Sequence, residues 1–274
     1  MKCNFHTHTY YCDGADAPED IVLTAIEKGF DCLGFSGHSY TYFDESYCML
    51  PDNVLKYAAE TRMLADKYAD RITILTGIEQ DYWSEEPTDA FDYVIGSVHY
   101  VKKDGAFLPV DESAEMFAAG VNEHYGGDVY AFAADYFKTV SDVVRRTNCN
   151  LIGHFDLISK FNAGGKMFDE SDPRYTSAWA EAIESLIPCG VPFEVNTAPL
   201  YKLGKTEPYP TRPMLEKIHA LGGKVALSSD SHSRDTLDAG FPEALAMLRD
   251  IGFAELTILG RNGAGQIPLT DFTG

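Results

Sequence analysis

Two histidines near the start of the chain, His6 and His8 in the stretch FHTHTYYCDG, are the first residues with an evident potential for chemistry. They follow the apolar run at 2–5, which is predicted to be a short β-strand. Residues two apart in a strand project to the same face, so both imidazoles can reach one point at the end of the strand. Such a pair can bind a metal ion. The same spacing also arises by chance on protein surfaces, so the pair alone leaves both interpretations open.

Further histidines and carboxylates follow the other short apolar runs. These runs are predicted to be buried strands because they are rich in Val, Ile, Phe and Leu, and they lie at 2–5, 32–36, 72–78, 93–98, 150–153, 192–196, 224–228 and 255–259. The polar residues at or just beyond their ends are His6, His8, His38, Glu79, His99, His154, Glu194, Asn196, Asp230 and His232. Six of these residues are histidines. If each were buried for a separate reason, six independent coincidences would have placed them at strand ends, so one shared metal centre is favoured. Imidazole and carboxylate ligands without thiolate favour zinc, manganese or iron.

The elements that must position these residues alternate along the chain. Segments with apolar residues at helical spacing lie between most of the strands, at 18–29, 53–68, 130–147, 175–187, 212–221 and 242–252. Alternating strands and helices indicate a parallel sheet, and seven or eight such units in one domain, 1–274, favour a β/α barrel. In a barrel the active site lies at the carboxyl ends of the strands, where the histidines fall. An open doubly wound sheet is the alternative, but it should carry a glycine-rich phosphate loop after its first strand.

Composition narrows the possible partners. The chain has 274 residues, 45% of them apolar, and a formal net charge of −20, which disfavours nucleic acid and anionic membranes as partners. It contains no run of about 18 apolar residues and no signal-peptide pattern. Its six cysteines form no CxxC pair, which fits a reducing compartment. We therefore expect a cytoplasmic protein, and the sequence gives no basis for an oligomeric state.

Eight short motifs carry a family resemblance through their order and spacing. They are FHTHTYYCDG, GFSGHSY, GIEQDY, GSVHYV, GHFDLI, EVNT, EPYP and SSDSH. Together they resemble the polymerase and histidinol phosphatase (PHP) superfamily, in particular its histidinol-phosphate phosphatases. The resemblance implies a distorted (β/α)7 TIM-like barrel with two or three divalent metal ions (Zn, Mn or Fe) in its mouth. The run at 255–259 would then be peripheral or would close the barrel irregularly.

The resemblance also implies a ligand set for three metal sites. The first site would use His6, His8, Glu79 and Asp230. Glu79 would bridge to a second metal held by His99 and His154, and the third would be held by Asp13, His38 and His232. Many histidinol-phosphate phosphatases of this family carry a histidine one residue beyond Asp13, where this chain has Gly14. Asp13 can be an oxygen ligand, and Asp-Gly is also a common turn, so both roles remain open.

The implied chemistry is metal-dependent hydrolysis of a phosphomonoester, most closely L-histidinol phosphate. A hydroxide shared by two metals would attack phosphorus without a phosphoenzyme, which makes Glu79 and Asp230 catalytic as well as ligating. Asp156 could donate a proton to the leaving alkoxide or orient a ligand histidine. Another small phosphorylated substrate, such as a nucleotide, is an alternative. So is a non-catalytic metal-binding barrel of the kind attached to polymerases.

Residues for substrate recognition are expected in the loops after the strands. Lys160 is the first candidate for binding phosphate, and Lys202 or Lys205 follows, although surface lysines serve equally well as solvated charges. Histidinol phosphate carries a cationic amine and an imidazole, which favours carboxylates and aromatic rings in its pocket. Tyr42 and Asp81 are candidates for this role, with packing of the loops as the alternative.

Overall fold

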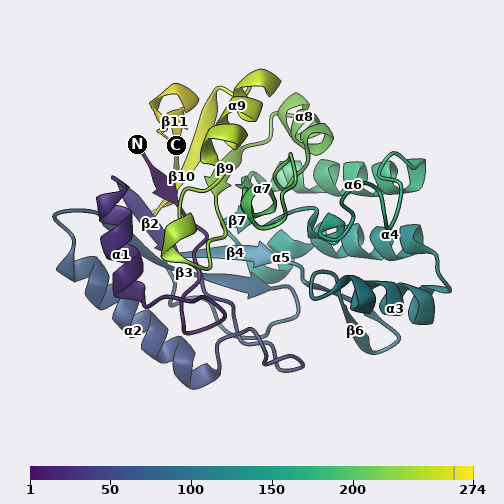
Figure 1. Cartoon of the computed structure of the whole chain (residues 1–274), viewed down its shortest axis with the longest axis horizontal. Helices are drawn as coiled ribbons and strands as arrows, with labels where there is room; N and C mark the ends of the chain where they lie inside the picture. The colour runs from purple at the N-terminus through teal and green to yellow at the C-terminus, as the bar shows by residue number, and fades with distance from the viewer. Residues whose placement is uncertain (262, 274) are drawn as a thin grey trace.

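Seven parallel strands form the centre of the protein in this computed structural model, which describes residues 1–261 and 263–273 (Figure 1). Their spatial order is β1 (Cys3–Asn4), β2 (Cys32–Phe35), β3 (Thr73–Asp81), β4 (Tyr93–Ser97), β7 (Leu151–Ile152), β8 (Phe193–Asn196) and β9 (Val225–Ser228). An isolated parallel bridge between Thr7 and Ser231 joins the first and last strands. The strands therefore form a nearly closed barrel, and the predicted fold class is confirmed.

Helices follow the strands and cover the outside of the barrel. The apolar pattern along the chain predicted most of them to within a few residues, because each helix buries one apolar face. They are α1 (Pro18–Glu27), α2 (Pro51–Lys67), α6 (Pro173–Leu186), α8 (Arg212–Ala220) and α9 (Phe241–Ile251). Short 3-10 turns lie at Leu157–Ser159, Ile187–Cys189, Arg234–Thr236 and Leu269–Asp271.

The helix predicted over 130–147 is two helices, α4 (Val129–Val140) and α5 (Val143–Thr147). The Ser141 hydroxyl donates to the carbonyl of Lys138 at 2.7 Å, at the end of α4. The Asp142 carboxylate then accepts from the Arg145 guanidinium, at the start of α5. Apolar residues keep their helical spacing across this break, so the pattern alone predicted one continuous helix.

Elements between β4 and α4, together with one after β8, were not predicted. They are the hairpin β5 (Tyr100–Lys103) and β6 (Ala106–Pro109), helix α3 (Ala114–Tyr125) and the short α7 (Ala198–Lys202). The Ser113 hydroxyl caps α3 by accepting from the Met116 amide at 3.1 Å. The two strands of the hairpin pair only with each other, so they lie outside the barrel sheet of the described chain.

The last predicted strand is also separate from the barrel. β10 (Glu255–Gly260) pairs antiparallel with β11 (Gly263–Pro268) in a sheet of their own. This confirms the peripheral alternative for 255–259. The two termini lie close together, as Figure 1 shows, and the Thr273 amide donates to the carbonyl of Met1 at 2.9 Å.

Tyr93 fills the interior of the barrel below the ends of the strands. Its hydroxyl donates to the carbonyl of Phe5 at 2.5 Å and lies 2.9 Å from that of Phe35. A Cβ at Gly34 or Gly77 would lie 2.3 Å from the Tyr93 side chain, so both positions require glycine. This packing fixes β1 and β2 directly beneath the histidines that follow them.

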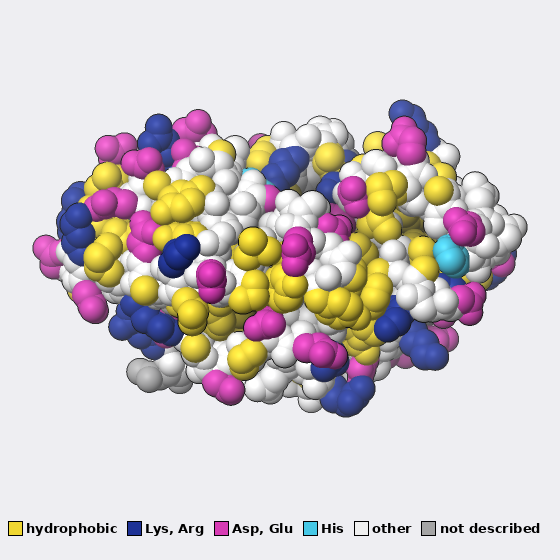
Figure 2. Space-filling view, turned by 90° about the horizontal axis from the view of Figure 1, so that it is seen from below, with side chains coloured by type: hydrophobic (Ala, Val, Ile, Leu, Met, Phe, Trp, Pro, Cys, Tyr) yellow, Lys and Arg dark blue, Asp and Glu magenta, His cyan; other side chains and the backbone are white. Residues whose placement is uncertain are grey.

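The outer surface mixes charge and apolar groups. On the face shown in Figure 2, acidic and basic side chains surround a band of apolar ones. Among the described residues, the helices include none that is long and apolar enough to span a membrane.

Candidate metal centre

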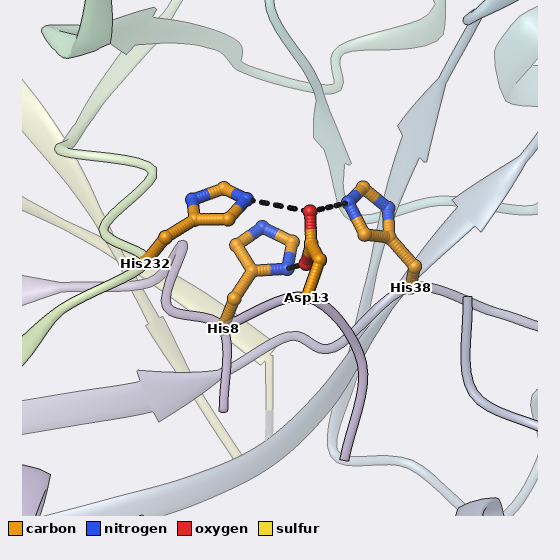
Figure 3. Close-up of side chains that lie close together, drawn as sticks. All are labelled: His8, Asp13, His38 and His232. Atoms are coloured by element: carbon orange, nitrogen blue, oxygen red, sulfur yellow. Dashed lines mark hydrogen bonds and ion pairs between the residues drawn. The ribbon is translucent and has the colours of Figure 1, made fainter. Parts of the chain in front are cut away.

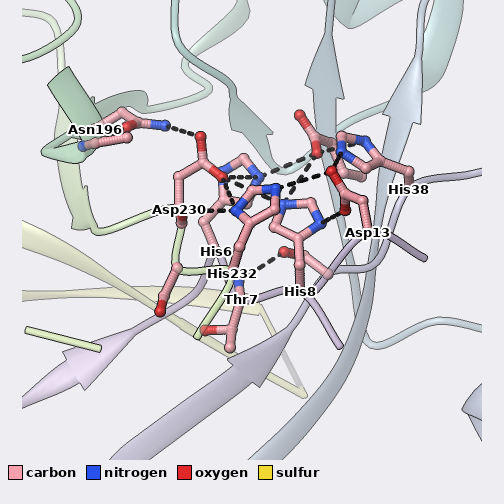
Figure 4. Close-up of polar contacts among 12 residues, drawn as sticks. His6, Thr7, His8, Asp13, His38, Asn196, Asp230 and His232 are labelled. Carbon is pink, nitrogen blue, oxygen red and sulfur yellow. Dashed lines mark hydrogen bonds and ion pairs between the residues drawn. The ribbon is translucent and has the colours of Figure 1, made fainter. Parts of the chain in front are cut away.

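The carboxyl ends of the barrel strands bring together the residues that the sequence analysis singled out. The side chains come from β1, β2, β3, β4, β7 and β9 or from the loops directly after them, and Figure 4 shows how several converge. The group comprises His6, His8, Asp13, His38, Glu79, His99, His154, Asp230 and His232. β3 extends to Asp81, so Glu79 lies within this strand and not just beyond its end as expected.

Glu79 is the centre of this group. Its Oε2 lies 2.9 Å from His38 Nδ1 and 3.1 Å from His6 Nε2. Its Oε1 lies 2.9 Å from His154 Nε2 and 3.4 Å from His99 Nε2. His8 Nε2 also lies 3.5 Å from Oε2. Because each carboxylate oxygen faces a different group of imidazoles, Glu79 is placed to bridge two metal ions.

Three sets of side chains hold their ligand atoms within 4.8 Å of one another. They are His8, Asp13, His38 and His232; His6, His8 and Glu79; and His38, Glu79 and His99. Figure 3 shows the first set, in which Asp13 lies between His38 and His232. Asp230 Oδ1 is 3.3 Å from His8 Nε2 and joins the second set. His8 and His38 each belong to two sets, which the sequence did not predict.

The buried polar atoms of this cluster fit a metal ion. His6 Nε2, His8 Nε2 and Glu79 Oε2 are inaccessible to solvent, and they have no hydrogen-bond partner in the described part of the chain. Buried polar atoms without partners are costly, and a metal ion would satisfy all three. Nitrogen and carboxylate donors in this mixture suit zinc, manganese and iron.

Electrostatics keep the carboxylates ready to bind metal. Burial alone would raise the pKa of Glu79, but the imidazoles of His38 and His6 outweigh it and hold that pKa well below its usual value. Burial, together with His232 and His38, lowers the pKa of His8 to about 3. An ionised glutamate and a neutral imidazole are the forms that ligate metals. Burial alone would lower the pKa of His38, but Glu79 and Asp13 outweigh it and raise that pKa to about 9, so a metal ion would displace a proton from this histidine.

A tight turn brings Asp13 into the cluster. The amides of Cys12 and Gly14 both donate to the carbonyl of Thr9, at 3.0 and 3.1 Å. A Cβ at Gly14 would lie 2.5 Å from the Thr9 nitrogen and 2.6 Å from the His8 carbonyl carbon. No side chain fits at this position, so the histidine that the family resemblance led us to expect here would require a different path for the turn.

Glu194 and Asp81 orient His6 and His99 by contacting the ring nitrogen that faces away from the cluster. Glu194 Oε1 lies 2.6 Å from His6 Nδ1, which leaves His6 Nε2 facing the cluster. Asp81 Oδ2 lies 3.1 Å from His99 Nδ1 in the same way. The structure thus places Asp81 behind a histidine and buried, instead of in the substrate pocket where we expected it. The sequence analysis placed Glu194 among the polar residues at the strand ends but did not predict that it contacts His6.

We expect Glu194→Gln to weaken metal binding about 10–100-fold. The carboxylate of Glu194 fixes the His6 ring and raises its basicity, and an uncharged amide would do neither as well. Competition with a chromogenic chelator measures this affinity. Glu170→Gln is the control, since Glu170 accepts from Asn162 and contacts no ligand histidine. Equal affinities for the wild type and Glu194→Gln would contradict the orienting role.

A cavity of about 230 Å³ opens above the cluster. Lys160 and Lys202 line it, whereas Lys205 does not. Tyr42 is 57% exposed and does not line the cavity, so its expected role in recognition has no structural support. Asp156 is fully buried outside the cavity wall, and its Oδ2 accepts from the Thr211 amide at 3.3 Å. Asp156 therefore cannot reach a substrate directly.

Acidic and aromatic residues also line the cavity. They are Asp44, which belongs to a loop expected to recognise the substrate, and Tyr47, Tyr100, Asp111, Glu112 and Tyr209, which the sequence analysis did not assign. The Tyr100 hydroxyl donates to Asp44 at 2.7 Å, and Asp111 pairs with Lys160 at 3.2 Å. Tyr100 lies in the hairpin β5–β6, and Asp111 and Glu112 follow it. Because the sequence analysis did not predict this hairpin, it did not place these three residues at the site.

Comparison with known proteins identifies the family. Residues 4–198 match the family model described as "PHP domain", and the chain belongs to this family. A relative from Schizosaccharomyces pombe, named "Probable histidinol-phosphatase", is 29% identical over 97% of this chain and 93% of its own.

Two solved structures share the fold. One from Listeria monocytogenes has a TM-score of 0.78 at 24% identity and covers 88% of this chain and 99% of its own. The other, a histidinol phosphate phosphatase from Lactococcus lactis complexed with zinc, L-histidinol and phosphate, has a TM-score of 0.72 at 21% identity. It covers 96% of this chain and 98% of its own.

Proposed function

We propose that the protein is a metal-dependent phosphomonoesterase that hydrolyses L-histidinol phosphate to L-histidinol and phosphate. The observation that carries the proposal is the bridging position of Glu79 between histidines on both sides, at the floor of a small cavity. The relative from S. pombe and the L. lactis complex with L-histidinol and phosphate support the choice of substrate. Two or three zinc, manganese or iron ions would be held by the nine clustered residues.

The residues that line the cavity include both basic and acidic side chains, as this substrate requires. Lys202 lies at the metal-binding side, where its Nζ is 2.8 Å from His232 Nδ1. Asp44 and Glu112 also line the cavity, where they can attract a cationic amine, whereas Asp111 is already paired with Lys160. A phosphate at the metal end and an ammonium group at the acidic end would both be stabilised. The acidic wall also disfavours an anionic nucleotide.

The residues divide the remaining work of the reaction. Bound metal ions supply a lowered pKa for water and neutralise the charge on phosphate. Glu79 and Asp230 would hold the ions, and Lys160 and Lys202 would bind the phosphate oxygens as point charges, Lys160 in exchange for its ion pair with Asp111. Burial raises the pKa of Asp156 to about 7. Because Asp156 does not line the cavity, we propose that it stabilises the surrounding backbone and does not donate a proton to the substrate directly.

We expect Lys160→Met to raise KM for L-histidinol phosphate about 10-fold or more, because a charged hydrogen bond to phosphate is lost. Steady-state kinetics measure KM and kcat separately. Lys138→Met, at an exposed position on α4, is the control for loss of a surface charge. A KM within twofold of the wild-type value would contradict phosphate binding by Lys160.

Kinetics on a panel of phosphomonoesters test the proposed function. The protein, purified with its metal content recorded, is given L-histidinol phosphate, a nucleoside monophosphate and an aryl phosphate. We expect kcat/KM for L-histidinol phosphate to exceed the others by several orders of magnitude. A flat or nucleotide-favouring profile would retain a metal phosphoesterase and reject the substrate. Absence of turnover by metal-loaded protein on every ester would favour a non-catalytic barrel.

A further inference from the structure

The seam between β1 and β9 is closed by an isolated bridge, and it lies directly beneath the metal centre. Within the described residues, β1 and β9 share no ladder, and the backbone bonds that join the two sides surround Thr7 and Ser231. The His8 amide donates to the carbonyl of Ser231 at 2.8 Å, and the Ser231 amide donates to the carbonyl of His6 at 3.1 Å. The two bridge residues are thus flanked by candidate ligands on both strands (Figure 4).

The register of this seam sets distances within the metal centre. His6 and His8 flank Thr7, while Asp230 and His232 flank Ser231. His8 Nε2 lies 3.3 Å from Asp230 Oδ1, and His6 Nε2 lies 3.7 Å from the same oxygen. A slip or spread of β1 against β9 would separate these atoms, because each pair comes from opposite sides of the seam.

Asn4 joins the two sides through its side chain. Its Nδ2 donates to Ser229 Oγ at 2.8 Å and to the carbonyl of Leu237 at 3.1 Å. Its Oδ1 accepts from the Ser229 amide at 3.1 Å and from the His6 amide at 3.2 Å. Asn4 is fully buried and contacts no ligand side chain, so its bonds serve the backbone that carries the ligands.

The residue after Ser229 has a strained backbone conformation. Asp230 has a φ of 52°, in the left-handed region that non-glycine residues adopt at a cost. The Ser229 amide and hydroxyl are both bound to Asn4, so the backbone is held immediately before the strained residue. The Tyr201 hydroxyl binds the carbonyls of Ser229 and Asp230 at 2.9 and 3.1 Å, so Asn4 holds the backbone before the strained residue and Tyr201 holds its carbonyl side.

We propose that Asn4 is a positioning residue for the metal centre, which locks β1 and β9 in the register that lets His6 and His8 share an ion with Asp230. The inference rests on the metal centre of the proposed function. Asn4→Leu keeps most of the side-chain volume but leaves the Ser229 and His6 amides without their acceptor. The ligands themselves remain intact in this variant.

Cobalt binding to metal-depleted protein tests the proposal without relying on phosphatase activity. We expect Asn4→Leu to bind Co²⁺ about 10–100-fold more weakly than the wild type, with altered visible absorption bands. Amide hydrogen exchange at residues 5–9 and 226–232 should increase in the metal-free variant. Asn4→Asp retains the acceptor oxygen and should recover part of the affinity. Ser229→Ala, which removes one bond, provides a milder disruption if Asn4→Leu fails to fold.

Thr61→Val is the matched control for loss of a buried polar contact. Thr61 is fully buried in α2, and its hydroxyl donates to the carbonyl of Tyr57 at 2.8 Å, away from the seam. Equal Co²⁺ affinity and spectra for Asn4→Leu and the wild type would overturn the inference and leave the proposed function standing. So would an equal loss in Thr61→Val, because the effect would then follow stability alone. A wild type that binds no Co²⁺ would overturn both.

Discussion

Glu79→Gln is expected to lower kcat for L-histidinol phosphate about 1,000-fold or more. Its carboxylate faces histidines through both oxygens, with His38 and His154 each at 2.9 Å. The amide of glutamine cannot supply two anionic oxygens, so the charge and the bridge between two metal sites are both lost. Turnover at saturating substrate and metal content per chain are the two measurements.

The matched control for this variant is Glu60→Gln. Glu60 accepts from the hydroxyls of Tyr10 and Tyr11, at 3.1 and 2.6 Å, and contacts no histidine. It should retain wild-type turnover and metal content. Circular dichroism and a cooperative thermal transition would show that Glu79→Gln still folds. Wild-type activity in folded Glu79→Gln would reject the bridging role and the metal mechanism with it.

Removal of metal should abolish activity and also lower thermal stability. Each site that is filled at about 1,000 times its Kd stabilises the folded state by about 4 kcal/mol. For a chain of this size that corresponds to about 8–16 °C in Tm for each site. The effect is expected because buried atoms such as His6 Nε2, His8 Nε2 and Glu79 Oε2 have no hydrogen-bond partner in the described chain. Calorimetry before and after chelation measures the shift.

Addition of zinc, manganese or iron to the chelated protein should restore both Tm and turnover, while Mg²⁺ tests whether an oxygen-preferring ion can substitute. The same titration on Asp230→Ala separates stability from chemistry, because this variant should regain less Tm and no activity. An unchanged Tm and undiminished turnover after complete chelation would contradict a metal centre at this site.

Much of the barrel and of the cluster could be predicted from local patterns in the sequence. A buried parallel strand is a short apolar run, and a parallel barrel places all its strand ends on one face. Histidines and carboxylates that repeatedly follow such runs must therefore converge, as His99 and His154 do at the end of β4 and β7. Most of the helices that cover the barrel could also be predicted, because their apolar spacing is a local pattern. The pattern was wrong at Ser141, where the spacing continues through a break, and it did not reveal α3 or α7.

Features that depend on contacts between distant segments could not be predicted in this way. The segments around Asp81 and Tyr42 have a composition that suits a substrate pocket, yet Asp81 ends β3 and contacts His99, and Tyr42 is exposed to solvent. The acidic wall containing Asp111 and Glu112 depends on the hairpin β5–β6, which leaves the barrel and returns to the cavity. Local periodicity carries no information on where such an excursion packs.

The sequence by itself determined which side chains gather at one end of the barrel, because strand periodicity and parallel topology are local and repetitive. Only the tertiary structure decided the position and the role of each residue within the site. It placed Glu79 between two pairs of histidines, Asp156 behind the cavity wall and Asn4 across the seam. These assignments depend on distances of a few ångströms between residues far apart in the chain, and those distances are set by packing of the whole barrel.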